Sequence, residues 1–160
     1  SLVQSTAPIY PDVYDVFYRD NVFKVTLPLT FESESAISME SYKLGLFKES
    51  AESMLYLVTE TLARGRRQHL TEKTFKPICL RMPFILVGTQ GSLKYLRSYG
   101  FKTFGDFWDE SYDDEQDNYI RIEKITAEIK RLCNLSPAEL QQMHQEMQDI
   151  LEYNFYHFYI

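Results

Sequence analysis

Cysteine, glycine and proline are all scarce in this chain, and several familiar site motifs are missing with them. The only cysteines, Cys79 and Cys133, lie far apart and form no CxxC pair, so we expect reduced structural thiols rather than a metal or redox motif. No glycine-rich phosphate loop and no GxSxG nucleophile motif occurs. No apolar run approaches the roughly 20 residues that span a membrane, and no signal peptide is visible. We therefore expect a cytoplasmic protein without a membrane span.

Positive charge is also in deficit, because the formal net charge is −6. A chain of this sign is not built to bind nucleic acid, so any phosphate site has to be local. The acidic run from Asp109 to Asp117 lacks the spacing and the glycine of a calcium loop, and we expect a solvated loop there. His144 and His157 have no third ligand nearby, so no metal site is predicted.

Hydrophobic residues are plentiful, at 44% of the 160 residues, and they favour one domain over residues 1–160 with a well-filled core. Residues 1–30 are rich in aromatic and β-branched side chains and predict a β-rich segment. Residues 53–61 and 83–88 are short apolar runs typical of strands buried on both faces. Thr71 predicts a helix start between them, with a kink or an early end at Pro77, and Gly100 predicts the end of the next helix.

This order of elements, a βαβα core over residues 53–108, predicts an α/β fold with a small parallel or mixed sheet flanked by helices, a Rossmann-like half-domain. We expect Tyr56–Thr59 and Phe84–Val87 to be neighbouring parallel strands. Residues 118–160 predict a helical C-terminal third. Its first helix carries an apolar stripe of Ile120, Ile122, Ile125, Ile129 and Leu132. The next begins at Ser136 and Pro137, and its expected buried stripe is Leu140, Met143, Met147, Ile150 and Leu151.

Polar residues gather where the two predicted strands end, and ligands of parallel sheets bind at that edge. Thr71 caps a helix whose free N–H groups suit a phosphate, and Lys73 adds a full charge in the same turn. Glu72 is placed to accept hydrogen bonds from ribose hydroxyls. The other candidate binding residues are Lys76 and the loop arginines Arg64 and Arg66. Glu60 is a candidate catalytic base by its position alone, and a buried carboxylate at the end of a strand is as often structural. For Glu72 and the loop arginines the alternative is also structural, since glutamate favours a first helical turn and basic loops are usually solvated.

The stretch "LTEKTFKPICLRMPFILVG", preceded by "YLVTET", resembles the donor-binding half of glycosyltransferases with two Rossmann-like domains, in particular fucosyltransferase-like enzymes and their phage and bacterial relatives. "LKYLRSYGFKTFGDFWDESYD" is similar to the phage-type members. The likeness extends from about Tyr56 to Leu132. It implies that Glu72 contacts the ribose and Lys73 the phosphates of a nucleotide sugar, which is a substrate, so no cofactor is expected.

Members of this class also carry an N-terminal domain that binds the acceptor, and the residues before Ser53 are too few for one. We expect the aromatic C-terminus "YNFYHFYI" to pack on the core, or to contact a second copy or a missing acceptor domain. Two functions follow from the sequence. One is a nucleotide-sugar-binding domain that transfers a sugar if it is active. The alternative is a non-catalytic structural or interaction domain that keeps the same fold.

Overall fold

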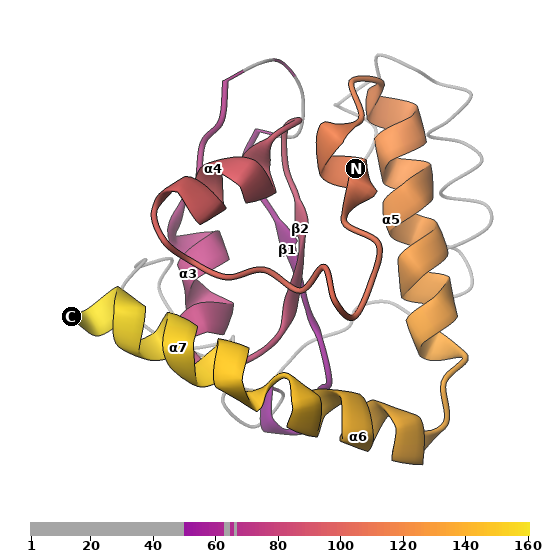
Figure 1. Cartoon of the computed structure of the whole chain (residues 1–160). Coiled ribbons are helices and arrows are strands. Elements are labelled where there is room, and N and C mark those ends of the chain that lie inside the picture. Colours follow the sequence, from indigo (N-terminus) through magenta and orange to yellow (C-terminus); the bar gives the residue numbers. More distant parts are fainter. Residues whose placement is uncertain (1–49, 63–64, 66) are drawn as a thin grey trace, which may run out of the picture. The chain divides into compact units, whose positions relative to one another are not determined.

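The computed structural model describes residues 50–62, 65 and 67–160 (Figure 1). The predicted β-rich segment of residues 1–30 lies outside the described residues, as do Arg64 and Arg66 of the predicted site. The described elements are β1 (Tyr56–Thr59), α3 (Glu72–Cys79), β2 (Phe84–Val87), α4 (Ser92–Ser98), the 3₁₀ helix η2 (Ser111–Asp114), α5 (Asn118–Cys133), α6 (Pro137–Glu146) and α7 (Gln148–Tyr159). They confirm the α/β class and the helical C-terminal part.

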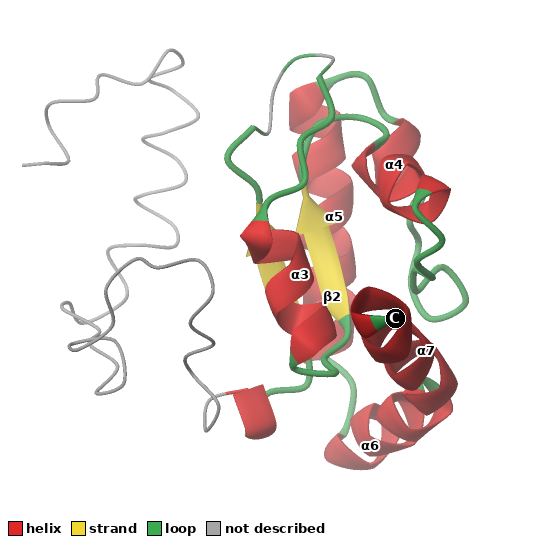
Figure 2. Ribbon diagram, turned by 90° about the vertical axis from the view of Figure 1, so that its left-hand side faces the viewer, coloured by secondary structure: helices red, strands yellow, loops and turns green. Residues whose placement is uncertain are grey.

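The two strands pair in parallel, as predicted, and in the register Tyr56 with Phe84 through Thr59 with Val87. Backbone bonds continue the ladder past both ends, because Tyr56 N–H donates to Pro83 and Glu60 N–H to Val87, each at 2.9 Å. Figures 1 and 2 both place the strands between α3 on one face and α5 on the other. With a helix on each face of the sheet, the first three residues of β2 are buried.

Burial on both faces is confirmed for β2 and is wrong for β1. The first three residues of β2 are buried, whereas in β1 only Val58 is. Leu57 keeps 46% of its surface exposed. Both strands lie at an edge of the two-stranded sheet that the described residues form. In β1 successive side chains point to opposite faces and differ in burial, so the described residues leave one face of this strand largely uncovered. The short apolar run therefore predicted the strand correctly, but it did not predict that most of the side chains of this strand are exposed or half-buried.

Local signals set the bounds of the two helices that follow the strands. Thr71 caps α3, as predicted, by accepting a bond from Lys73 N–H. The helix ends at Cys79, two residues after Pro77, which cannot donate to the preceding turn. α4 closes on Gly100, whose φ of +89° lets its N–H bond back to Arg97 at 2.9 Å.

The inward face of α5 differs from the predicted isoleucine stripe. Ile125 and Leu132 are buried, but Ile120 and Ile122 are exposed. Arg121 lies on the buried face instead, and its guanidinium donates to the carbonyl of Glu115 at 2.8 Å. A hydrogen-bonded arginine can be buried at this position, which turns the two isoleucines outward.

The C-terminal stripe is confirmed in part, since the segment forms two helices that meet at Met147. Ser136 and Glu139 make a capping box at the start of α6, with Pro137 at its first turn. Met147 and Leu151 are fully buried, while Leu140, Met143 and Ile150 are only half-buried. α7 packs along α3, where Phe158 stacks on Phe75 at 5.4 Å.

Asn154 ties α7 to the segment that follows α4. Its side chain accepts a bond from Lys102 N–H at 2.8 Å and donates to the Lys102 carbonyl at 2.9 Å. Among the described residues, the core contains side chains from both strands and from α3, α4, α5 and α7. Its members are Val58, Ile78, Phe84, Ile85, Leu86, Leu93, Leu96, Phe101, Phe104, Trp108, Tyr112, Ile125, Leu132, Met147 and Leu151. In the part of the chain that the structure describes, no helix has both the length and the apolar character needed to cross a bilayer.

Replacing Leu151 with alanine is expected to lower the free energy of unfolding by about 2–5 kcal/mol, because the cavity opens among fully packed side chains. Leu151 is 3% exposed. Leu57→Ala is the matched control, since the same atoms are removed from a side chain that is 46% exposed, and its cost should stay below about 1 kcal/mol. Urea denaturation of the full chain measures both. Equal losses would show that α7 is not part of the core.

Candidate functional site

Glu60 follows the last residue of β1 and joins that strand to the start of α3. Its carboxylate accepts bonds from Thr71 N–H at 2.8 Å and from the hydroxyls of Thr71 and Thr74 at 2.7 and 2.6 Å. A fourth bond comes from Thr61 N–H at 3.3 Å. The residue is only 6% exposed. Glu60 therefore clamps the polar edge of the sheet to the first turn of α3.

Two opposing effects act on the pKa of Glu60. Burial alone raises it, but the hydrogen bonds from Thr74, Thr71 and Thr61 stabilise the charged form and outweigh burial, so the pKa is lowered below its usual range. A base needs a free lone pair and a pKa near the working pH. The geometry of Glu60 favours an ionised structural anchor.

Glu72 and Lys73 lie beside this clamp and are open to solvent, as expected. Their side chains are 39% and 42% exposed. Lys73 Nζ donates to Glu72 Oε1 at 3.1 Å and to Thr61 Oγ1 at 3.2 Å. The hydrogen bond from Lys73 lowers the pKa of Glu72, so this carboxyl is ionised at neutral pH. Lys76 is half-buried one turn further along α3.

The first amides of α3 are already engaged within the chain. Thr71 accepts Lys73 N–H with its hydroxyl at 3.3 Å and Thr74 N–H with its carbonyl at 3.1 Å. Thr71 N–H itself points to Glu60. The expected role of Thr71 as a cap is confirmed, but its helix start does not present a row of free donors. An anion near α3 would depend on side-chain cations more than on the helix terminus.

The turn after β2 meets the loop that leads into α3. Thr89 Oγ1 donates to the Arg67 carbonyl at 3.1 Å, and Gln68 Nε2 donates to the Gln90 carbonyl at 3.1 Å. Thr89 and Ser92 are buried, and their hydroxyl oxygens lie 3.3 Å apart. The sequence predicted that the ends of the two strands share one edge, and these bonds join the two segments there.

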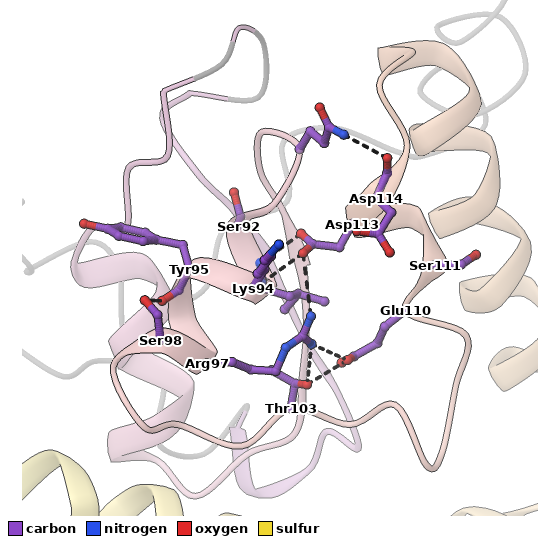
Figure 3. Close-up of polar contacts among 12 residues, drawn as sticks. Ser92, Lys94, Tyr95, Arg97, Ser98, Thr103, Glu110, Ser111, Asp113 and Asp114 are labelled. Carbon is purple, nitrogen blue, oxygen red and sulfur yellow. Dashed lines mark hydrogen bonds and ion pairs between the residues drawn. The ribbon is translucent and has the colours of Figure 1, made fainter.

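The expectation of a solvated loop over the acidic run is wrong for Asp113. This residue is buried in η2 and its carboxylate accepts Leu93 N–H at 2.8 Å and Lys94 N–H at 2.9 Å (Figure 3). Its carbonyl accepts Gly91 N–H at 2.8 Å. Asp113 thus caps α4 from a distant part of the chain. A capping role is recognisable in sequence only when the cap directly precedes its helix.

Glu110 is a half-buried carboxylate of the acidic run. One oxygen accepts Phe104 N–H at 2.8 Å. The other accepts the Thr103 hydroxyl at 2.7 Å and Arg97 Nη1 at 3.1 Å (Figure 3). Burial raises the pKa of Glu110 despite these donors. These side-chain contacts come from the neighbouring turn and from α4, so we assign Glu110 to holding the 101–110 segment against that helix.

The structure brings Glu60, Thr71, Glu72 and Lys73 together and sets Lys76 one turn away. Within residues 50–62, 65 and 67–160, no group of three or more histidine, cysteine, aspartate or glutamate side chains is placed to hold a metal ion. Cys79 and Cys133 are free thiols. A structural role for Glu60 was one of the alternatives that the sequence left open, whereas that of Asp113 was missed. The partners of both carboxylates lie at distant positions in the chain.

Glu60→Gln is expected to reduce the free energy of unfolding at neutral pH by about 1.5–3 kcal/mol, since an amide cannot accept all the bonds of a buried carboxylate. Glu72→Gln is the matched control, and its exposed ion pair should contribute less than about 1 kcal/mol. Chemical denaturation measures both. A loss from Glu60→Gln no larger than that from the control would contradict the clamp.

The stability difference between the wild type and Glu60→Gln should also depend on pH. The native pKa of Glu60 lies below its unfolded value of about 4.3, so its stabilising effect is complete above that pH and is lost as the pH falls through the native pKa. The difference between wild type and Glu60→Gln should therefore shrink on acidification below about pH 4.3. Denaturation in a series of acidic buffers tests this, and a constant difference would contradict it.

The chain was also compared with known proteins. No protein-family model, no curated protein and no solved structure matches it.

Proposed function

We propose that this domain binds the nucleoside diphosphate part of a nucleotide sugar at the carboxyl edge of the β1–β2 sheet, in the manner of a glycosyltransferase donor domain. The observation that carries the proposal is the accessible Glu72–Lys73 pair, held in the first turn of a helix that directly follows a parallel strand. Parallel sheets bind their ligands at this edge. The pair combines a cation for phosphate with an ionised acceptor for hydroxyl groups.

Lys73 is the residue assigned to the phosphates. Its ammonium group is bonded to Glu72 and to the hydroxyl of Thr61, and both contacts are at the surface. An exposed ion pair contributes little to stability, so Lys73 can exchange Glu72 for a diphosphate at small cost. Lys76 lies on the same side of α3, one turn further on, and can add a second charge.

In this proposal Lys73 also supports the transfer step, if the domain is active. When a sugar leaves a nucleotide donor, negative charge develops on the diphosphate, and a positioned cation stabilises it. Glu72 remains the acceptor for the ribose hydroxyls. Glu60 is assigned a positioning role, because its oxygens already accept four hydrogen bonds. The base for the acceptor would then be supplied by another group.

The second candidate is a non-catalytic interaction domain with this fold. It is favoured by the exposed side chains at the end of α7, namely Tyr153, Tyr156, Phe158, Tyr159 and Ile160. Aromatic groups are enriched in the buried centres of protein interfaces. It is also favoured by the carboxylates of Glu60 and Asp113, which hold the starts of α3 and α4 without any ligand. Diphosphate binding discriminates between the two functions.

Guanosine, uridine or cytidine diphosphate is expected to bind the full chain in a calorimetric titration, and Lys73→Ala should weaken binding by roughly tenfold or more. The lost charge-assisted contact is worth on the order of 1.5–3 kcal/mol. Glu72→Gln should weaken the binding of the nucleotide and leave the binding of plain pyrophosphate unchanged, because only the nucleotide carries a ribose.

Lys130→Ala is the control, since it removes an exposed lysine from α5, on the other side of the sheet. It should bind like the wild type. If no diphosphate binds the wild type at millimolar concentration, or if Lys73→Ala and Lys130→Ala bind equally well, the nucleotide-sugar function is wrong. The interaction domain is then the better conclusion.

A further inference from the structure

A pocket of about 280 Å³ lies between α3, α4 and the loop that leads into α3. Phe75 and Phe101 line it, with ring centroids 5.8 Å apart. Both rings are supported from α7, because Phe158 stacks on Phe75 at 5.4 Å and His157 packs edge-on against Phe101 at 4.8 Å. This part of the pocket is therefore held in place before any ligand arrives.

Two tyrosines of α4 form another wall. Tyr95 and Tyr99 are one helical turn apart, with rings 5.0 Å apart and hydroxyls 2.7 Å apart. Tyr95 is half-buried and Tyr99 is 55% exposed, so the wall extends from the interior to the rim. A flat ligand can lie against these rings and keep one edge in water.

The remaining wall, Gln68 to Leu70, is polar at its rim and fixed in position. Gln68 donates to the Gln90 carbonyl, and Gly91 allows the close approach, because a Cβ there would lie 3.2 Å from Gln68 Nε2. The Gln68 amide oxygen and the His69 imidazole add hydrogen-bonding groups beside the aromatic rings. Among the residues that the structure describes, no carboxylate, lysine or arginine lines the pocket.

We propose that this pocket binds a neutral, planar heteroaromatic ring of the nucleobase class. Aromatic walls favour a ring that stacks, and a nucleobase has few edge groups, which the amide and the imidazole can meet. A pyranose carries hydroxyl groups around its whole edge, and too few polar side chains line the pocket to satisfy them. The described lining offers a phosphate or a carboxylate group no cation to pair with, which favours a neutral ring as the part that is bound.

The pocket and the Lys73 site are separate features of α3. Lys73 and Phe75 are two positions apart, so their side chains diverge by about 200° around the helix. Phe75 lines the pocket and Lys73 does not. The inference therefore does not depend on the Lys73 site. A nucleoside still carries the ribose assigned to Glu72, so the test has to follow the residues that line the pocket.

The experiment is a titration of the isotope-labelled full chain with adenosine, guanosine, uridine and cytidine, followed by amide chemical shifts. At least one nucleoside at millimolar concentration should shift the amides of Gln68, His69, Tyr95 and Phe101 in a saturable way. Tyr99→Ala should weaken this binding on the order of tenfold by removing a stacking surface. Tyr99→Phe keeps the ring and should bind within a few-fold of the wild type.

Tyr156→Ala is the matched control, because Tyr156 is 53% exposed against 55% for Tyr99 and lies outside the pocket. It should bind nucleosides like the wild type. The inference is overturned if no nucleoside shifts these amides, if methyl pyranosides shift them instead, or if Tyr99→Ala binds as well as Tyr156→Ala. Loss of pyrophosphate binding alone would count only against the Lys73 site.

Discussion

The carboxylate of Glu60 fixes the geometry on which the candidate site depends. It lies at the end of β1 and accepts hydrogen bonds from the backbone N–H and the hydroxyl of Thr71, the N-cap of α3. A buried charge is tolerated only when its oxygens are satisfied, so these donors cannot move away independently. The end of the strand and the start of the helix are therefore one rigid unit. Glu72 and Lys73 project from that unit at a fixed place beside the sheet.

Asp113 holds the start of α4 by accepting backbone N–H groups, as Glu60 holds the start of α3. In each case a carboxylate from the chain itself holds the first turn of the helix that follows a strand. In many nucleotide-binding α/β proteins a phosphate of the ligand takes that place, because free amides and the helix dipole attract it. Here the helix starts are complete without a ligand. The proposed recognition of a diphosphate would thus depend on Lys73 and other side-chain cations, and the proposed recognition of a ring would depend on the aromatic pocket.

The features that could be predicted from the sequence have local signals. The Thr71 cap and the two short strands are visible within a few residues, and both are confirmed. The bonds of Glu60 reach residues eleven and fourteen positions away, and Asp113 caps an amide twenty positions away. No motif encodes such distances, so the acidic run was interpreted as solvated. The pocket was missed because three separate segments line it.

Gly100 is difficult to replace, because two separate obstacles meet at this position. Its φ of +89° disfavours any other residue, and a Cβ there would lie 2.7 Å from His157 Nε2. The imidazole is exposed, but it bonds the Tyr99 carbonyl at 2.7 Å and stacks on Tyr153, so moving it away breaks both contacts. A side chain at position 100 therefore strains the backbone and displaces His157 from its partners. A smaller residue at position 157 removes only the second obstacle, so the sequence is freer to vary at position 157 than at position 100.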